Sequence, residues 1–224
     1  MGYKEEFIEF MVRSKVLTFG EFTLKSGRKS PYFINTGLYR TGAQIAKLGE
    51  YYAACFMAQV KGGANALYGP AYKGIPLVVA TAAALYQRYQ VDIPYCFNRK
   101  ESKDHGEGGL IIGYKPVDGD SIVMIDDVTT AGTAMRENLP IIQGEADTTV
   151  KALIISVDRM EKGTGQLSAV QQIKNDFGID VHPIVTVRDI LAHLHGREIG
   201  GQVVIDNAIK EKMELYLQEY GAQQ

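Results

Sequence analysis

The chain has 224 residues, of which 46% are hydrophobic and 22% charged, and its formal net charge is -2. This composition is that of an ordinary globular protein and excludes long disordered or low-complexity segments. The small net charge excludes a sequence-independent grip on nucleic acid, which needs many lysine and arginine residues to neutralise phosphates. We therefore expect no nucleic-acid partner.

The location expected for the chain is the cytoplasm. No apolar run reaches the length of a membrane span, and the first residues are charged where a secretory signal has an apolar core. Cys55 and Cys96 lie in apolar surroundings without the spacing of a disulfide framework or of a metal site, which indicates a reducing compartment. We therefore expect no contact with a membrane.

The first 40 residues predict a small N-terminal unit. Phe7, Phe10 and Met11 recur at helical spacing within residues 4–16 and predict an amphipathic helix. Residues 22–35 consist of two short extended runs around a Gly/Ser turn, which predicts a hairpin. We expect this N-terminal unit to span residues 1–40, and an α/β core with a C-terminal helix to span residues 41–224.

From about Thr41 onward, helical segments alternate with short apolar strands. The runs 122–125 and 152–155 are apolar throughout, which is typical of strands covered on both faces. The expected fold class is therefore α/β, with a central, mostly parallel sheet flanked by helices. The expected helices are 44–60, 75–89, 134–143, 167–176 and one marked by Ile205, Ile209, Met213, Tyr216 and Tyr220, and the expected strands are 66–68, 93–97, 110–112, 121–125, 151–157 and 181–187.

Segment 123–134 is a strand that ends in Asp126 and Asp127, followed by a threonine-rich turn that opens a helix. Ligands of α/β sheets bind at the carboxyl ends of the strands, and the free N–H groups at a helix start hold an anion. Two carboxylates would repel a phosphate beside them, unless sugar hydroxyls or a hydrated Mg²⁺ lie between the carboxylates and the phosphate. The segment suits a ribose 5-phosphate, and an acidic strand end that only caps the helix is the alternative.

Two further segments carry basic residues. Residues 68–74 join a strand to a helix and contain two glycines and Lys73, while residues 98–109 gather three cations and a histidine before a run of glycines. A loop of the second kind can close over a highly charged anion and exclude water. On the residues alone, an ordinary strand-to-helix loop and a solvent-exposed charged loop are the simpler explanations.

Segment 123–134 resembles the PRPP (phosphoribosyl pyrophosphate) motif of the type I phosphoribosyltransferases. Residues 68–74 match the pyrophosphate loop of that family, residues 98–109 closely match the catalytic lid of its orotate enzymes, and residues 22–33 resemble their N-terminal hood. The resemblance implies the type I phosphoribosyltransferase fold. It also implies the transfer of ribose 5-phosphate from PRPP to orotate with Mg²⁺, which releases pyrophosphate on the route to UMP.

The resemblance also assigns residue roles. Asp126 and Asp127 are expected to meet the ribose hydroxyls, and the turn after them is expected to wrap the 5-phosphate. Arg159 matches the position that holds the orotate carboxylate, for which a planar guanidinium is suited, although an arginine after a strand is commonly a surface residue. The expected catalytic residues are Lys103, His105, Asp126 and Asp127; the expected PRPP-binding residues are Lys25, Tyr72, Lys73, Arg99, Lys100, Lys103, His105, Asp126, Asp127, Val128, Thr129, Thr130, Ala131, Gly132, Thr133 and Ala134; and the expected orotate-binding residues are Phe33, Ile34, Thr130 and Arg159.

Further expectations concern the cofactor, the assembly and the competing functions. Mg²⁺ is expected to be bound mainly through PRPP and water, with no direct protein ligand. Because the lid of the family reaches into the neighbouring active site, a homodimer is implied. Ile34 stands where many members have a second aromatic residue, so weaker stacking on the base is expected. The alternatives are a phosphoribosyltransferase for a purine base, against which the hood and Arg159 argue, and a non-catalytic PRPP-sensing regulator, which would usually need an added DNA-binding module.

Overall fold

The computed structural model describes residues 2–24, 26–103, 109–128, 132–163 and 165–223, and for residues 102 and 103 it describes the backbone only. The helices are α1 (Tyr3–Arg13), the 3-10 helix η1 (Thr36–Leu38), α2 (Gly42–Gln59), α3 (Gly74–Tyr89), α4 (Thr133–Gln143), α5 (Ala169–Phe177), α6 (Val187–Leu194) and α7 (Asn207–Tyr220). The strands are β1 (Leu17–Thr23), β2 (Lys29–Ile34), β3 (Ala66–Gly69), β4 (Tyr95–Lys103), β5 (Gly109–Gly113), β6 (Ser121–Ile125), β7 (Thr149–Asp158), β8 (Asp180–Thr186), β9 (Glu198–Ile199) and β10 (Gln202–Val203). None of the helices in the described part of the chain is both long and apolar enough to cross a lipid bilayer.

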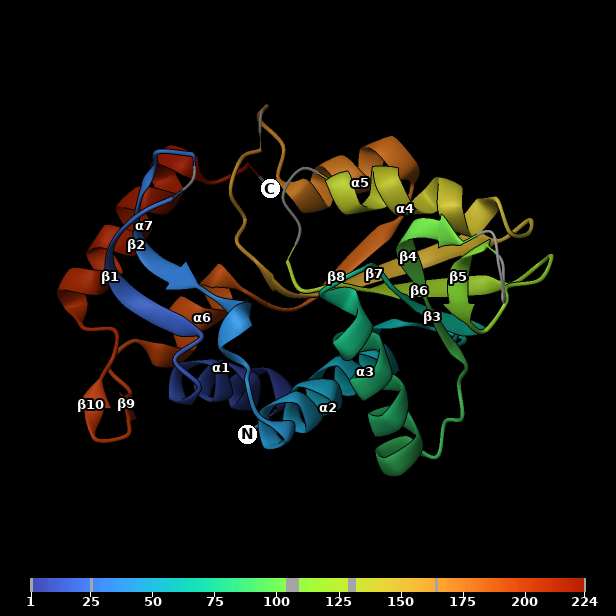
Figure 1. Ribbon diagram of the computed structural model, residues 1–224. Helices are drawn as coiled ribbons and strands as arrows, with labels where there is room; N and C mark the ends of the chain where they lie inside the picture. The colour runs from blue at the N-terminus through green and yellow to red at the C-terminus, as the bar shows by residue number, and fades with distance from the viewer. Residues whose placement is uncertain (1, 25, 104–108, 129–131, 164, 224) are drawn as a thin grey trace.

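Six strands form the central sheet, in the order β5-β4-β3-β6-β7-β8 (Figure 1). Each neighbouring pair in this sheet is parallel except β4 and β5, which are antiparallel. Strands β3 and β6 are neighbours although β4 and β5 lie between them in the chain, so the strand order changes direction at this point. The mostly parallel sheet predicted from the apolar strand runs is confirmed, and the ends of β3 and β6 form the kind of crevice in which such folds bind ligands.

Helices cover both faces of the sheet, as the fully apolar strands require. Along β6, Val123 and Ile125 belong to the core under α2 and α3, while Ile122 and Met124 belong to the core under α4 and α5. All four side chains are fully buried. Figure 1 shows the two pairs of helices on opposite sides of the sheet. The strand ends therefore rest on a core that is packed from both sides.

The predicted N-terminal hairpin is also present, with β1 and β2 paired antiparallel. Helix α7, from the other end of the chain, packs against β2, and Figure 1 shows it alongside the hairpin. The Tyr32 and Tyr216 rings meet edge to face with centroids 6.0 Å apart, and the Arg28 guanidinium lies 5.0 Å from the centroid of the Tyr220 ring. The region matched to the hood is thus covered by the C-terminal helix.

Several predicted boundaries differ from the structure by a few residues, and two of the differences have a clear physical cause. The strand expected to end at Phe97 continues to Lys103, because it also pairs with β5 beyond Phe97: Asn98 lies opposite Ile111 and Lys103 opposite Gly109. The strand expected to include Val187 ends at Thr186, whose side chain accepts a hydrogen bond from the N–H of Asp189 and so begins α6. This reciprocal cap, followed by apolar residues at helical spacing, is a start signal that the prediction missed.

Candidate active site

Asp126 and Asp127 directly follow β6 and are held by the neighbouring strand. The Asp126 N–H donates to the Ile154 carbonyl at 3.0 Å, and the Asp127 carbonyl accepts from the Ser156 N–H at 2.8 Å and from the Ser156 hydroxyl at 2.6 Å. The Tyr52 hydroxyl donates to the Asp126 carbonyl at 2.7 Å. Because all these backbone groups are paired, the two carboxylates occupy fixed positions at the end of the sheet.

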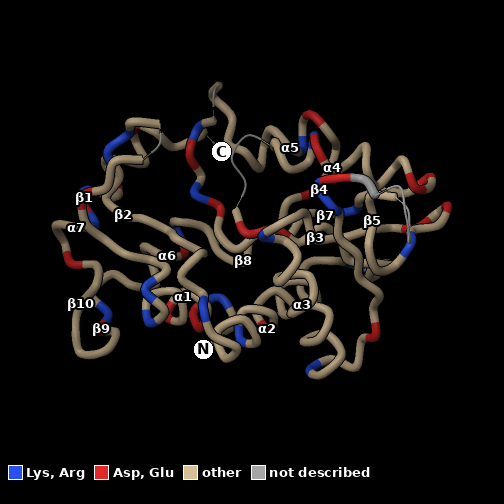
Figure 2. Tube along the Cα trace, viewed as in Figure 1, with Lys and Arg blue, Asp and Glu red and all other residues tan. Residues whose placement is uncertain are grey.

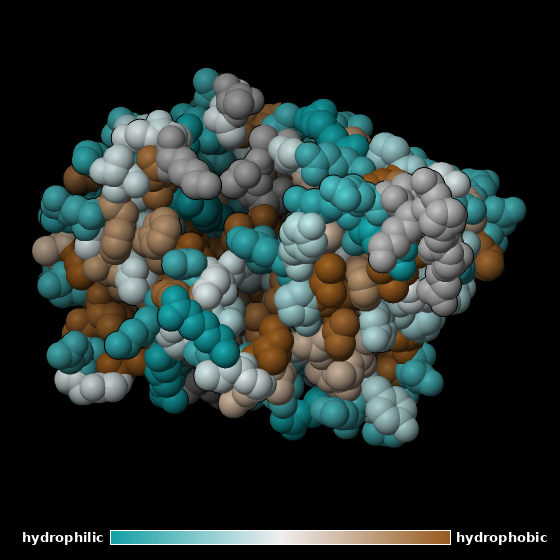
Figure 3. Space-filling model, viewed as in Figure 1, coloured by the Kyte–Doolittle hydropathy of each residue, from teal (hydrophilic) through white to brown (hydrophobic). Residues whose placement is uncertain are grey.

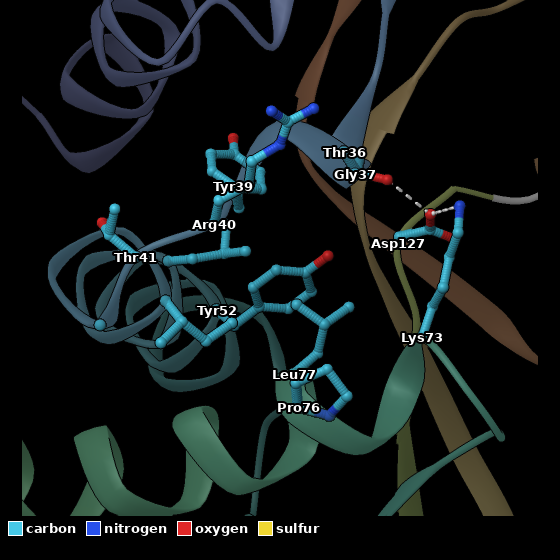
Figure 4. A pocket seen from close by; sticks show the side chains of 13 residues that line it. Thr36, Gly37, Tyr39, Arg40, Thr41, Tyr52, Lys73, Pro76, Leu77 and Asp127 are labelled. Carbon is cyan, nitrogen blue, oxygen red and sulfur yellow. Dashed lines mark hydrogen bonds and ion pairs between the residues drawn. The ribbon is translucent and has the colours of Figure 1, made fainter.

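Asp127 joins three segments that are far apart in the sequence (Figure 4). Its Oδ2 accepts a hydrogen bond from Lys73 Nζ at 2.6 Å and one from the Thr36 hydroxyl at 2.8 Å. Lys73 belongs to the loop after β3, and Thr36 begins η1 after the hairpin. The structure thus brings the matched pyrophosphate loop onto the second acid of the matched PRPP motif. Thr36 carries no sequence signal that could have predicted this contact.

Asp126 lies in an environment that disfavours its charge. The carboxyl group is 8% exposed, and burial followed by the charge of Asp127 raises its pKa from 3.8 to about 7. The Asp127 N–H, which donates to Asp126 Oδ1 at 2.8 Å, and the charge of Lys73 oppose this rise. Asp126 is therefore a carboxyl group that exchanges its proton near neutral pH, where a nearby cation favours the ionised form.

The start of α4 depends on a glycine. Gly132 is the residue before the helix and has a φ of 68°, in the left-handed region that favours glycine. A Cβ atom at this position would lie 3.2 Å from Ile173 Cγ1, so close packing also favours glycine. Val128, Thr133 and Ala134 border the same turn, whereas Thr129, Thr130 and Ala131 lie outside the described residues.

The loop after β3 lies beside the outer part of β4. Asn98 Oδ1 accepts from the Ala71 N–H at 2.7 Å, and the Lys100 ammonium lies 4.8 Å from the centroid of the Tyr72 ring. The peptide bond between Ala71 and Tyr72 is cis. Tyr72, Lys73, Arg99 and Lys100 therefore belong to one neighbourhood. Of the other predicted cations, Lys25 and His105 lie outside the described residues, and Lys103 is described only in its backbone at the end of β4.

Arg159 lies in a second cluster, just beyond β7. Its Nε and Nη2 atoms both donate to Glu161 Oε1, at 3.0 and 2.7 Å, and its guanidinium lies 5.3 Å from the centroid of the Tyr32 ring. The predicted base-binding residues Phe33 and Ile34 lie on β2, next to Tyr32. Phe33 is 38% exposed and stacks on Phe22 with ring centroids 5.5 Å apart, whereas Ile34 packs against the core.

A cavity of about 480 Å³ adjoins the first cluster (Figure 4). Leu77, Ile45 and Leu48 give it an apolar wall, and Lys73 and Asp127 stand at its polar side. Arg159 is not among the described residues that line it. The lining residues are Thr36, Gly37, Tyr39, Arg40, Thr41, Gly42, Ile45, Leu48, Tyr52, Lys73, Pro76, Leu77 and Asp127.

Comparisons with known proteins agree with this geometry. No protein-family model matches the chain. An orotate phosphoribosyltransferase of Lachnoclostridium phytofermentans is 50% identical over 221 residues, which cover 99% of this chain and 98% of that protein. One of Clostridium beijerinckii is 48% identical over 221 residues, which cover 99% of each chain.

Solved structures extend the likeness to the fold. The crystal structure of orotate phosphoribosyltransferase from Francisella tularensis superposes with a TM-score of 0.85 at 38% identity, and the match covers 97% of this chain and 100% of that one. Leishmania donovani UMP synthase shares the fold with a TM-score of 0.71 at 22% identity, over 98% of this chain and 43% of that chain. With identities near 50% over almost its whole length, the chain belongs to the orotate phosphoribosyltransferase family.

Proposed function

We propose that the chain transfers ribose 5-phosphate from PRPP to the ring nitrogen of orotate, and that the crevice at the ends of β3 and β6 binds PRPP. The observation that carries the proposal is the contact of Lys73 with Asp127 at 2.6 Å, which joins the two segments matched to the PRPP motifs. In this assignment Asp126 and Asp127 meet the ribose hydroxyls. The turn from Val128 to Ala134 wraps the 5-phosphate, with N–H groups at the start of α4 as donors.

The same proposal assigns the pyrophosphate to the basic neighbourhood beside the crevice. Displacement of pyrophosphate from C1 of the ribose develops positive charge on the sugar and negative charge on the leaving group. Cations near the leaving group stabilise that negative charge more in the transition state than in the ground state. The residues proposed for this stabilisation are Lys73, Arg99, Lys100, Lys103 and His105, with Lys25 close by and Tyr72 as a further PRPP contact. The proposed catalytic residues are Lys103 and His105 of the lid together with Asp126 and Asp127.

Mg²⁺ fits this arrangement as a partner of PRPP. Two adjacent carboxylates, each less than 10% exposed, lie at this end of the sheet, and burial followed by the charge of Asp127 raises the pKa of Asp126 despite the charge of Lys73. A hydrated cation between them and the phosphates of PRPP would compensate their charge. When bound, Mg²⁺ would neutralise charge on the leaving pyrophosphate. We propose that it is held through PRPP and water.

Orotate is proposed to bind on the hairpin side of the crevice. Arg159 follows β7 three residues after Ser156, which binds Asp127, so its backbone lies at the same edge of the sheet as the PRPP site. Its guanidinium is proposed to hold the orotate carboxylate, with Phe33, Ile34 and Thr130 around the ring. A purine base lacks this carboxylate, and the arginine therefore supports orotate over the purine alternative.

The proposed assembly is a homodimer in the cytoplasm, in which each lid serves the neighbouring active site. Figure 3 shows apolar side chains gathered over α3. Val79, Tyr86 and Tyr89 of α3 and Tyr95 of β4 are each more than a third exposed, which is typical of a surface that meets a partner. The location rests on the two cysteines, which are both buried free thiols.

The test is a substrate panel with purified protein, Mg²⁺ and PRPP. Orotate consumption is followed by its absorbance change, and adenine, hypoxanthine and uracil are followed by product detection. We expect turnover of orotate alone. Turnover of a purine base would overturn the assignment of the base, and PRPP binding without turnover of any base would favour the PRPP-sensing regulator.

A further inference from the structure

The segment after β7 contains a second charged residue that the proposed function does not use. Glu161 Oε1 accepts hydrogen bonds from both Nε and Nη2 of Arg159 and, at 2.8 Å, from the Tyr32 hydroxyl. Its other oxygen, Oε2, lies 3.7 Å from Arg28 Nη1. The Glu161 side chain is 12% exposed. In Figure 2 basic and acidic positions alternate along this segment, next to the C-terminal end.

Glu161 determines which edge of the Arg159 guanidinium remains available. A guanidinium presents its donors along planar edges, and here one oxygen of Glu161 accepts from both donors of one edge. The edge formed by Nε and Nη2 is taken by Glu161, so the end formed by Nη1 and Nη2 is the one that can receive a second carboxylate. The Tyr32 ring against the guanidinium restricts its remaining rotation.

Tyr32 remains a donor in this arrangement. Burial, followed by the charge of Glu161, raises the pKa of Tyr32 well above its ordinary value. The phenol is therefore protonated at any physiological pH, and its hydroxyl stays bound to Glu161. Since Tyr32 lies on β2 and Glu161 follows β7, this contact also joins the hairpin to the end of the sheet.

The backbone around Glu161 is held by the C-terminal segment. The Lys162 N–H donates to the Tyr220 carbonyl at 2.8 Å, and the Ala222 N–H donates to the Met160 carbonyl at 2.9 Å. Met160 has a φ of 56°, a left-handed conformation that is unfavourable for a residue with a side chain. The segment needs such outside contacts to keep this shape, and Figure 1 shows the end of α7 leading to it.

We propose that Glu161 is a positioning residue for orotate, which fixes the Arg159 guanidinium so that its free end faces the orotate carboxylate. The proposal rests on the proposed role of Arg159. Charge alone predicts the reverse effect, because Arg28 and Arg159 with Glu161 carry a net charge of about +1, and neutralising Glu161 would attract the anionic substrate more strongly. The two explanations therefore predict opposite changes in the KM for orotate.

The experiment compares Glu161→Gln with the wild type in steady-state kinetics. Gln keeps the shape but loses the charge-assisted hydrogen bonds, so we expect the KM for orotate to rise about tenfold. The KM for PRPP should change less than about twofold, because Glu161 does not contact that side of the crevice. The matched control is Glu50→Gln, which removes a carboxylate paired with Arg88 and Lys47 on other parts of the surface; it should change neither KM.

Two companion variants separate the possible failures. If Arg159→Ala leaves the KM for orotate unchanged, the proposed role of Arg159 is wrong. If Arg159→Ala raises it and Glu161→Gln leaves it unchanged or lowers it, the positioning role alone is wrong. Tyr32→Phe removes the hydrogen bond from the Tyr32 hydroxyl to Glu161 and keeps every charge, so it should raise the KM for orotate about threefold. Should Glu161→Gln fail to fold, this variant decides the proposal in the same way.

Discussion

Replacement of Asp126 by Asn should stabilise the ligand-free protein at neutral and alkaline pH. Asn is nearly isosteric with Asp, and its side-chain oxygen can still accept the Asp127 N–H that now binds Asp126 Oδ1 at 2.8 Å. What the substitution removes is the charge, in a position where burial and the charge of Asp127 raise the pKa of the carboxyl to about 7. The stabilised variant should have lost activity, since Asp126 is proposed to bind the ribose.

The magnitude and its pH dependence follow from linkage. Below about pH 3 the carboxyl is protonated in both the folded and the unfolded chain, so the buried position of Asp126 does not lower the free energy of unfolding. As the pH rises from about 4 to about 7, the unfolded chain loses the proton while the folded chain keeps it, and the free energy of unfolding falls. The rise from 3.8 to about 7 corresponds to about 4 kcal/mol at pH 8, and to about 2 kcal/mol at pH 5.

Urea unfolding of both proteins at pH 5, 6, 7 and 8, without PRPP or Mg²⁺, measures this difference. Asp126→Asn should be more stable at every pH, by an amount that grows by about 2 kcal/mol from pH 5 to pH 8. The control Asp92→Asn removes an exposed carboxyl group and should show no such growth. A constant advantage over this range, or a variant less stable than the wild type at pH 8, would refute the reasoning.

Two further predictions concern the lid and the phosphate turn. Lys103→Ala should lower kcat by orders of magnitude with an unchanged melting temperature, because the residue stands at the very end of β4, opposite Gly109 of the edge strand β5; an unchanged kcat would exclude the proposed role at the pyrophosphate. Gly132→Ala should destabilise the protein by more than about 1 kcal/mol and raise the KM for PRPP, because it combines a left-handed φ with a Cβ that meets Ile173. Gly178→Ala is its control in urea unfolding, since Gly178 has a similar φ of 72° and open space around it; an equal loss in both would show that crowding at Gly132 has no effect.

The sequence predicts the parallel sheet because its central strands have a simple signature. The runs at 122–125 and 152–155 are apolar at every position, and such strands can lie only between two layers of helices. The outer part of β4 has the opposite composition, because four of the five residues 99–103 are charged. The apolar pattern of a buried strand is therefore missing there, and the sequence gives no sign that these residues form a strand. Pairing with β5 decides its conformation, and that pairing is not local.

Within the site, contacts between neighbouring strand ends are predictable and contacts between side chains of distant segments are not. Asp126 and Asp127 are placed by the end of β6, and Lys73 by the end of β3, so their meeting follows from a parallel sheet. The contacts of Thr36 with Asp127 and of Glu161 with Tyr32 depend on how the hairpin is seated on the sheet. No spacing in the sequence encodes that arrangement, since the partners are 91 and 129 residues apart.

In the ligand-free protein, Asp127 Oδ2 already accepts two hydrogen bonds from the protein's own groups. A sugar hydroxyl that binds this oxygen must share it with, or replace, the Lys73 ammonium and the Thr36 hydroxyl. Each exchange trades one hydrogen bond for another, and its net free energy is small compared with that of a bond formed from nothing. A ligand gains most when it offers a new partner for the released lysine as well as hydroxyls for the acid. Under the proposed assignment, the contacts of the ligand-free protein therefore favour a sugar that carries both hydroxyls and a pyrophosphate.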